Sequence, residues 1–415
     1  MSNKVVISLK RLVPGLIIGP ASWLGPYIVM VSLFLPALLQ ELDAENKIPL
    51  LALFSTLGMI VAALSNMLAG ALSDNTRSRF GKRAPWIVGG AFAFMASMTA
   101  ASFSQGIPML LTSWMVGQAA LNFIVAPMVA WLDFAEDDKK GTASSAYGGL
   151  GMALGNNGFN VIGAMFLGQF RTGFIIFGII AFIGVLISVF IVNEPSNLEE
   201  AAEEKQASQE KKPGLSWQTV KKVFPAWNIG RDYYLALIGK LFQGIGNFAV
   251  TGYILYIMTD FLLMGDGTAS SIQLLNSVML AFGILMGFVA GPLSDKFNVL
   301  KLPVGLSPIF LALGALALFL LRDDGILIYA LCAGLGMGLW NSLDNLLNLR
   351  VIPDKERVAF FLGVYNLGNT LTQAIAPIIA ATVISLFGFS SVFFVSMVFS
   401  IIGGLCVLSI KSIGR

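Results

Sequence analysis

The sequence predicts an all-α membrane protein with twelve transmembrane helices in two halves of six. Three observations support this prediction. Of the 415 residues 56% are hydrophobic and only 12% are charged, the apolar residues fall into twelve long runs, and the second half of the chain repeats features of the first. With a mean hydropathy of +0.80, the chain lacks the polar surface that a soluble protein of this size needs.

Each apolar run is long enough to cross a bilayer, which takes about 20 helical residues. The predicted spans cover residues 12–39, 49–72, 85–104, 109–132, 143–168, 172–192, 233–263, 270–293, 302–321, 325–349, 358–386 and 389–410. The first run follows a basic segment and continues to Leu39 without a small-residue cleavage site. It is therefore expected to be a spanning helix and not a signal peptide.

A polar segment separates the first six spans from the last six. The expected organisation is an N-terminal half (residues 1–192), a cytoplasmic linker (193–231) and a C-terminal half (232–415). The linker contains the run EEAAEEKQASQEKK, which is too charged to bury itself and is typical of a mobile connection.

Two pairs of similar segments indicate that the halves are duplicated. The string GALSDN at Gly70 returns as GPLSDK at Gly291, and residues 135–151, after the fourth span, parallel residues 352–368, after the tenth. Two halves of the same topology place a substrate site near the bilayer midplane, between them.

The distribution of Lys and Arg predicts the orientation. With the termini and the even-numbered loops on one side, that side holds 22 of the 26 cations, the other side holds Lys47, Arg171 and Arg322, and Lys240 lies within a span. Positive charge is retained on the cytoplasmic side. We therefore expect a multi-pass protein of the cell membrane, monomeric and surrounded by lipid, with both termini in the cytoplasm.

Several functional classes are excluded by what the chain lacks. It has no histidine, its two cysteines (Cys332 and Cys406) lie in apolar runs, and it contains no nucleotide-binding loop, metal-ligand cluster or nucleophile with a base. We therefore expect no enzyme activity, no cofactor and no metal site. The net charge of +3 comes from loops, which argues against nucleic acid as a partner. Any proton coupling must use Asp, Glu or Lys.

Three strings resemble known carriers. TRSRFGKRAPWI (Thr76–Ile87) closely resembles the loop between helices two and three of the glycoside-pentoside-hexuronide:cation symporters, the melibiose permease type, within the major facilitator superfamily. Residues 73–85 are also similar to the corresponding string of the sucrose:proton symporters, and AYGGLGMALGN (Ala146–Asn156) looks like their fifth helix. The resemblance implies the major facilitator fold and a sugar carrier coupled to a cation.

One departure from the melibiose type bears on the coupling ion. The two helix-two aspartates that help to form the family's cation site correspond here to Asn66 and Ala62, whereas Asp133 matches the family's helix-four aspartate. Proton coupling, or uniport, is therefore favoured over a sodium site.

A cluster of charge between the second and third spans is the expected cytoplasmic gate. An anion at Asp74 suits the N-terminus of a neighbouring helix, and the arginines of the loop are expected to pair with Asp133 or Glu136 when the cytoplasmic ends are closed. The predicted gate residues are Asp74, Arg77, Arg79, Gly81, Lys82, Arg83 and, in the second repeat, Asp295.

Ionisable residues within spans are costly and indicate function. Lys240 and Asp344 lie about 10 Å and 9 Å along their helices from the cytoplasmic ends, so an ion pair between them is predicted. The alternatives are a lysine that snorkels to the headgroups and an aspartate that pairs with a cytoplasmic cation. The candidate ion-coupling residues are Asp133, Lys240 and Asp344.

Uncharged amides at helical spacing, together with a few aromatic residues, suit a ligand with many hydroxyl groups, because amides both donate and accept hydrogen bonds. Contacts between packed helices are the alternative role for the amides, and anchoring or packing for the aromatic residues. The candidate substrate-binding residues are Trp23, Tyr27, Gln118, Asn122, Asn156, Lys240, Gln243, Asn247, Trp340, Asn341, Asn369 and Gln373.

The sequence thus predicts a secondary active transporter that moves a neutral sugar or glycoside by alternating access, with a proton as the preferred coupling ion. Two alternatives remain open at this point. The aromatic and methionine-rich spans also fit an exporter of lipophilic compounds, and the same fold would serve a membrane sensor that binds a ligand without transporting it.

Overall fold

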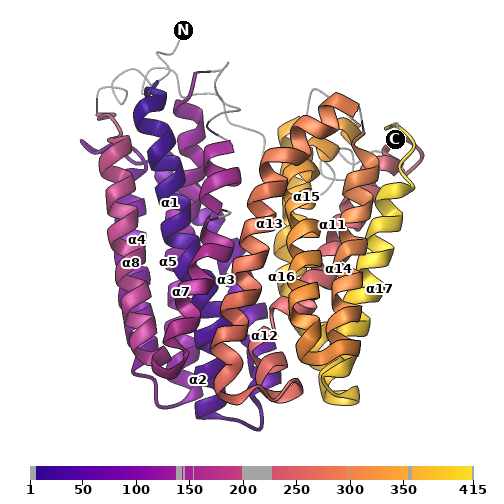
Figure 1. Ribbon diagram of the computed structural model, residues 1–415. Helices are drawn as coiled ribbons and strands as arrows, with labels where there is room; N and C mark the ends of the chain where they lie inside the picture. Colours follow the sequence, from indigo (N-terminus) through magenta and orange to yellow (C-terminus); the bar gives the residue numbers. More distant parts are fainter. Residues whose placement is uncertain are drawn as a thin grey trace.

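The computed structural model describes residues 6–136, 143, 145–152, 154–198, 227–297, 299–353 and 358–413. Within these ranges every regular element is a helix, and the helices form two bundles that stand side by side (Figure 1). The first and last described residues lie at the same end of the molecule. We call this end the terminal face and the other end the opposite face.

The first bundle, indigo to magenta in Figure 1, contains the first six predicted spans. Its elements are α1 (Leu9–Val29), η1 (Met30–Phe34), α2 (Leu35–Leu42), α3 (Lys47–Asp74), α4 (Ala84–Ser102), α5 (Ile107–Val129), η2 (Ala130–Phe134), η4 (Ser145–Gly151), η5 (Leu154–Gly158), α7 (Phe159–Gly163), η6 (Ala164–Gln169) and α8 (Phe170–Val192). The first span is the whole of Leu9–Leu42, in which η1 is a π-helical turn.

The second bundle, salmon to yellow in Figure 1, contains the other six. Its elements are α11 (Trp227–Thr251), α12 (Ile254–Tyr256), η7 (Ile257–Phe261), η8 (Gly265–Gly267), α13 (Thr268–Phe297), α14 (Lys301–Leu321), η9 (Arg322–Asp324), α15 (Gly325–Val351), α16 (Val358–Phe387) and α17 (Ser390–Leu408). The predicted linker falls mostly between α8 and α11, where residues 199–226 lie outside the described part of the chain.

Among the described residues nine helical segments are long and apolar enough to span a membrane, and a bent pair makes a tenth. Two of the nine hold two predicted spans each, because their helices break within them. Leu154–Val192 breaks at Gln169, where φ is −137°, and Lys301–Asp344 breaks at Arg322, where φ is +55°. The twelve predicted spans are thereby accounted for.

Two spans differ from the continuous helices that were predicted. The described residues of the fifth span form separate π-helical (145–151 and 154–158), α-helical (159–163) and 3-10 (164–169) segments, and residues 233–263 bend by 46° after Thr251. Glycine explains the first departure, because it lowers helix propensity and permits close packing. A Cβ on Gly151 would lie 2.9 Å from the carbonyl oxygen of Ile17 on α1, and one on Gly163 would lie 2.4 Å from Val29.

The two bundles contact each other toward the opposite face. There α3 packs on α16 and α7 packs on α13, the Thr56 hydroxyl donates to the carbonyl of Ala374 (3.2 Å), and the Tyr256 hydroxyl donates to that of Pro36 (2.9 Å). Toward the terminal face, in contrast, the apolar residues of α3 around Met67 are exposed. The described contacts between the bundles therefore gather toward the opposite face, and the bundles diverge toward the terminal face (Figure 1).

Candidate functional site

A buried cluster of three ionisable side chains lies inside the second bundle. Lys240 of α11 donates to Asp344 Oδ2 of α15 at 2.7 Å, with side chains only 3% and 7% exposed. The Tyr365 hydroxyl of α16 donates to the other carboxylate oxygen, and the Lys240 ammonium lies 4.1 Å from the centre of the Tyr365 ring. The predicted proximity of Lys240 and Asp344 is present, and Tyr365 was not predicted.

The cluster is electrically balanced in this arrangement. Removing a charge from water costs several kcal/mol, which a buried partner recovers only with good geometry and further hydrogen bonds. Both oxygens of Asp344 have a donor, and Lys240 has a carboxylate and a ring face. Each charge of the pair therefore has partners within the described part of the protein.

Two amides continue along α11 from Lys240. Gln243 and Asn247 are both buried. The Gln243 amide donates to the sulfur of Met337 at 3.1 Å, a weak acceptor, and the side-chain oxygen of Asn247 has no partner among the described residues. Among the described residues, therefore, Asn247 has an acceptor without a donor and Gln243 has only a weak partner.

In the first bundle, the predicted residues of α1 and α5 meet. The Tyr27 ring stacks on Trp114 with 6.5 Å between centroids and 25° between planes, and Gln118 donates to the Tyr27 hydroxyl at 3.2 Å. One turn further along α5, Asn122 accepts from Asn66 at 3.1 Å and donates to the Gln118 carbonyl at 2.9 Å. This surface is aromatic and amide in character, and none of these side chains carries a charge.

An amide contact that the sequence analysis missed joins the bundles. Ser32 donates to the side-chain oxygen of Asn160 at 3.1 Å, and the Asn160 amide reaches the side-chain oxygen of Asn276 on α13 at 3.5 Å. An asparagine inside a predicted span was the available signal for Asn276. The neighbouring Asn156 is half-buried.

The remaining predicted substrate residues take different places. Trp23 and Trp340 are buried among the apolar side chains of the two cores, which is the packing role that was the alternative for them. Asn341 and Asn369 are exposed, and Gln373 is half-buried. The structure does not bring these five together with the Tyr27 or Lys240 groups through any described hydrogen bond.

The loop after α3 is held by an acid from the end of α8. Glu194 is buried and accepts from the backbone N–H groups of Lys82 (2.9 Å), Arg83 (3.2 Å) and Ala84 (3.0 Å) and from the indole of Trp131 (3.4 Å). A carboxylate at a helix N-terminus is stabilised by the orphan N–H groups and the helix dipole. The anion at the N-terminus of α4 is therefore Glu194, where the sequence analysis had considered only Asp74 for such a role.

Gly81 makes this contact geometrically feasible. Its φ is +88°, and a Cβ there would lie 2.3 Å from Glu194 Cγ. Burial raises the pKa of Glu194 above its usual value, although the hydrogen bonds from Ala84, Trp131, Arg83 and Lys82 act in the opposite direction.

The other predicted gate residues lie around the same loop. Arg77 donates to the Thr76 carbonyl at 3.3 Å, and Arg79 and Arg83 lie 4.8 Å and 5.9 Å from the ring centres of Phe80 and Phe134. Asp133 is an exposed residue of η2. The side chains of Asp74 and Asp295 lie outside the described part of the structure, so their gate role stays a prediction.

A latch that the sequence did not predict closes the opposite face. The Lys47 ammonium contacts both Gln40 and Asp260, so it joins the first bundle to η7 of the second. It also lies 4.8 Å from the ring centre of Tyr256, whose hydroxyl bonds Pro36. The other two cations of this face act within one bundle: Arg171 pairs with Glu41, and Arg322 donates to the Phe261 carbonyl.

The described residues contain no group of three or more His, Cys, Asp or Glu side chains that would hold a metal ion. The family model of the Major Facilitator Superfamily matches residues 21–266 and 236–412, which together cover most of the chain. The protein belongs to this superfamily. It is therefore a multi-pass membrane transporter of small molecules and not an enzyme.

Solved structures of superfamily transporters share the fold. A bacterial homologue of the human lysosomal transporter Spinster, in an inward-facing and unoccupied conformation, is 13% identical with a TM-score of 0.71, over 96% of this chain and 95% of that one. The peptide transporter POT in complex with sulfate is 14% identical with a TM-score of 0.69, over 98% and 96%. A search of curated protein sequences finds no match.

Proposed function

We propose that this transporter moves a neutral sugar or glycoside across the cell membrane by alternating access, coupled to protons, with both termini in the cytoplasm. Two halves, residues 1–192 and 232–415, would move about the linker 193–231. The observation that carries the proposal is the contrast between the two polar sites: an uncharged amide and aromatic surface on α1 and α5, and one balanced ion pair on α11 and α15.

The amide and aromatic surface supports a neutral, hydroxyl-rich substrate. Gln118, Gln243 and Asn247 offer both donors and acceptors, and the half-buried Tyr27 ring, which stacks on the buried Trp114, supplies the aromatic group that packs on a sugar ring. A charged substrate would need an opposite charge, whereas Lys240 and Asp344 already neutralise each other. The likeness of Thr76–Ile87 and Ala146–Asn156 to the sugar symporters points the same way.

The residue at the helix-two position of the cation site, Asn66, favours protons over sodium as the coupling ion. Asn66 donates an amide N–H to Asn122. Hard cations such as sodium take oxygen ligands, so this N–H, at a position that is acidic in melibiose-type carriers, cannot ligate one. Asp344 is the carboxylate that remains deep within a span. In the proposed cycle its protonation releases Lys240, and its deprotonation restores the pair.

The arrangement of contacts corresponds to the inward-facing state if the terminal face is cytoplasmic. Outward opening then requires the Lys47 and Asp260 latch to break. The exposed apolar residues of α3 around Met67 become buried as the terminal face closes, and the gate residues Asp74 and Asp295 hold it shut. The terminal face of the structure is thus the release side of the proposed uptake cycle.

Uptake by purified protein in proteoliposomes tests the proposal. An acidic exterior should drive accumulation of at least one member of a panel of neutral sugars, such as melibiose, sucrose, raffinose and methyl glucoside, and an inward sodium gradient at fixed pH should not. Three results would contradict it: transport of lipophilic dyes alone, which indicates an exporter; transport of peptides alone, since the POT neighbours are named peptide transporters; or sugar binding without accumulation, which indicates a sensor.

A further inference from the structure

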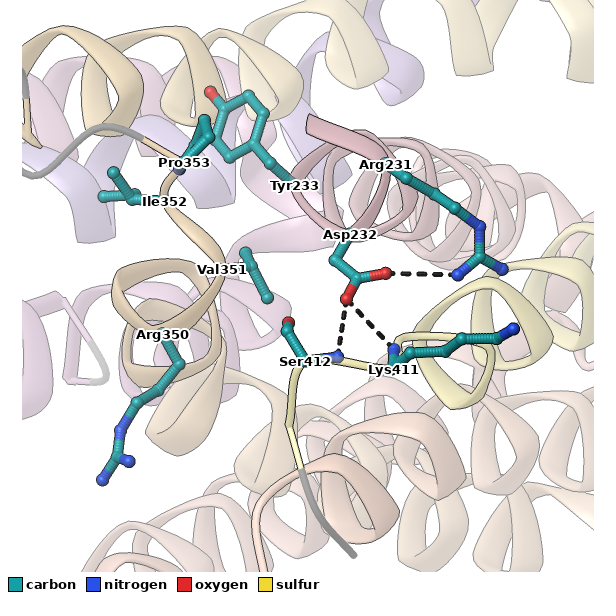
Figure 2. Close-up of a pocket in the computed structure, with 9 residues that line it drawn as sticks. All are labelled: Arg231, Asp232, Tyr233, Arg350, Val351, Ile352, Pro353, Lys411 and Ser412. Atoms are coloured by element: carbon teal, nitrogen blue, oxygen red, sulfur yellow. Dashed lines mark hydrogen bonds and ion pairs between the residues drawn. The ribbon is translucent and has the colours of Figure 1, made fainter. Parts of the chain in front are cut away.

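A polar cavity opens on the terminal face of the second bundle, separate from the space between the bundles. Its volume is about 340 Å³. Figure 2 shows its lining, which comes from the start of α11 and the ends of α15 and α17: Arg231, Asp232, Tyr233, Arg350, Val351, Ile352, Pro353, Lys411 and Ser412. The Arg350 and Lys411 side chains at its rim are exposed and extend away from its centre. The cavity is therefore open to water, and the acid facing its interior is Asp232.

One face of α15 leads from this cavity to the buried ion pair. Val351 lines the cavity, Asn348 lies one turn deeper, and Asp344 lies one turn beyond that. Seven residues of helix span about 10 Å. The same distance is covered on α11 between Tyr233 of the cavity lining and Lys240, since these two residues are also seven apart.

Asn348 is a buried polar residue on this face of α15, between the cavity and the pair. Its side chain is 0% exposed, and neither its amide nitrogen nor its oxygen has a hydrogen-bond partner in the described part of the protein. Its buried neighbours on α15, Leu347 and Val351, are apolar. Buried polar atoms without a protein partner are normally satisfied by water, which occupies polar sites and makes two to four hydrogen bonds there.

From these observations we propose that Asp344 releases its proton to the terminal face through water held at Asn348 and through the cavity at Asp232. This exit path runs inside the second bundle and is distinct from the substrate route. The inference rests on the proposed proton coupling. In the release step the O–H bond of the Asp344 carboxyl breaks, the proton passes to water, and the carboxylate re-forms its contact with the Lys240 ammonium, which keeps its own protons.

The surroundings of Asp344 leave few other carriers for this proton. The charged or titratable groups in contact with it are Lys240 of α11 and Tyr365 of α16. The helices α13 and α14 also pack on α15, but their charges lie only at their terminal-face ends, at residues 295, 296 and 301. Tyr233, between Tyr365 and the cavity, donates its hydroxyl to the Phe361 carbonyl at 2.7 Å.

Hydrogen–deuterium exchange of the Asp344 carboxyl tests the path without a substrate. The full-length protein in lipid nanodiscs is transferred from H₂O to D₂O at mildly acidic pH. The exchange is followed by the carboxylic C=O infrared band that Asp344→Asn removes. Asn348→Leu should slow the exchange by roughly tenfold or more, because an apolar side chain gives water no partner. Asn348→Ala, which leaves room for water, should keep the wild-type rate and serves as the folding control.

Tyr329→Phe is the matched control, because Tyr329 is also a buried residue of α15 with an orphan side-chain atom but lies near the start of that helix, away from the cavity. It should leave the exchange rate unchanged. Wild-type exchange in Asn348→Leu, or equal slowing in Tyr329→Phe, would overturn the path and leave the space between the bundles as the route of the proton. Absence of any Asp344 carboxyl band in the wild-type protein would overturn proton coupling itself, and the path with it.

Discussion

Neutralising either member of the Lys240 and Asp344 pair should destabilise the protein much more than neutralising both. Lys240→Met leaves the Asp344 carboxylate in a site where its side chain is 7% exposed, with Tyr365 as its remaining donor. Asp344→Asn leaves the ammonium with a neutral amide and the face of the Tyr365 ring at 4.1 Å. Both substitutions preserve approximate shape, so the charge is the main change.

The magnitude follows from the burial of the pair. Stranding one charge of a buried ion pair costs about 3–5 kcal/mol. The ring of Tyr365 offsets about 2 kcal/mol of this for a stranded ammonium, and a stranded carboxylate can be neutralised by a proton. We therefore expect losses near the lower end of that range for each single variant, and recovery of most of the loss in the double variant.

The assay is a double-mutant cycle with two readouts on the same preparations. Equilibrium unfolding in mixed micelles gives the free-energy differences, and counterflow and pH-driven accumulation in proteoliposomes give the transport steps. Each single variant should lose accumulation, and the double variant should regain stability and retain facilitated diffusion of the sugar. Strictly additive free energies, or single variants with normal accumulation, would show that Lys240 is a snorkelling lysine and Asp344 a structural aspartate.

Three further predictions concern the two faces. Lys47→Ala should shift spin-label distances across the opposite face toward wider separations. The ratio of the wide to the narrow population should rise about fivefold, because a partly exposed ion pair contributes about 1 kcal/mol. Exchanging Lys47 and Asp260 should restore the wild-type distances, and unchanged distances in Lys47→Ala would refute the latch. Gly81→Ala should destabilise the protein by about 1–3 kcal/mol in thermal unfolding, because a Cβ at φ +88° meets Glu194; Gly89→Ala, where a Cβ meets nothing within 4 Å, is the control. Burial raises the pKa of Glu194, so the folded state keeps this proton to higher pH than the unfolded state. Folding stability should therefore fall as pH rises from the usual pKa of glutamate through the raised one. Glu194→Gln should flatten that part of the stability profile, and a profile identical to the wild type would contradict the assignment.

The spans were predictable because their signal is local. A run of about 20 apolar residues specifies a crossing whatever surrounds it, so the breaks at Gln169 and Arg322 coincide with predicted boundaries. The irregularities inside spans could not be predicted from the sequence. The fifth span, for example, depends on how closely Gly151 and Gly163 approach α1. That approach is a property of the packed pair of helices and not of either segment alone.

The candidate site was predictable only in part, for the same reason. Lys240 and Asp344 stood out because charges inside spans are rare, and equal depth was enough to suggest a pair. Tyr365 carries no charge, and so its hydroxyl gave no comparable signal. The contacts of Lys47 with Asp260 and of Glu194 with the loop at Gly81 join segments whose relative positions depend on tertiary packing, which single-sequence patterns do not specify.

The most direct test of the central claim is proton movement caused by a sugar. Proteoliposomes containing a pH-sensitive dye would receive, from outside and without an imposed gradient, a sugar that binds the protein. The account predicts acidification of the lumen that is abolished in Asp344→Asn, while counterflow of labelled sugar persists in the Lys240→Met and Asp344→Asn double variant. Entry of labelled sugar into wild-type proteoliposomes with no change in luminal pH would contradict it.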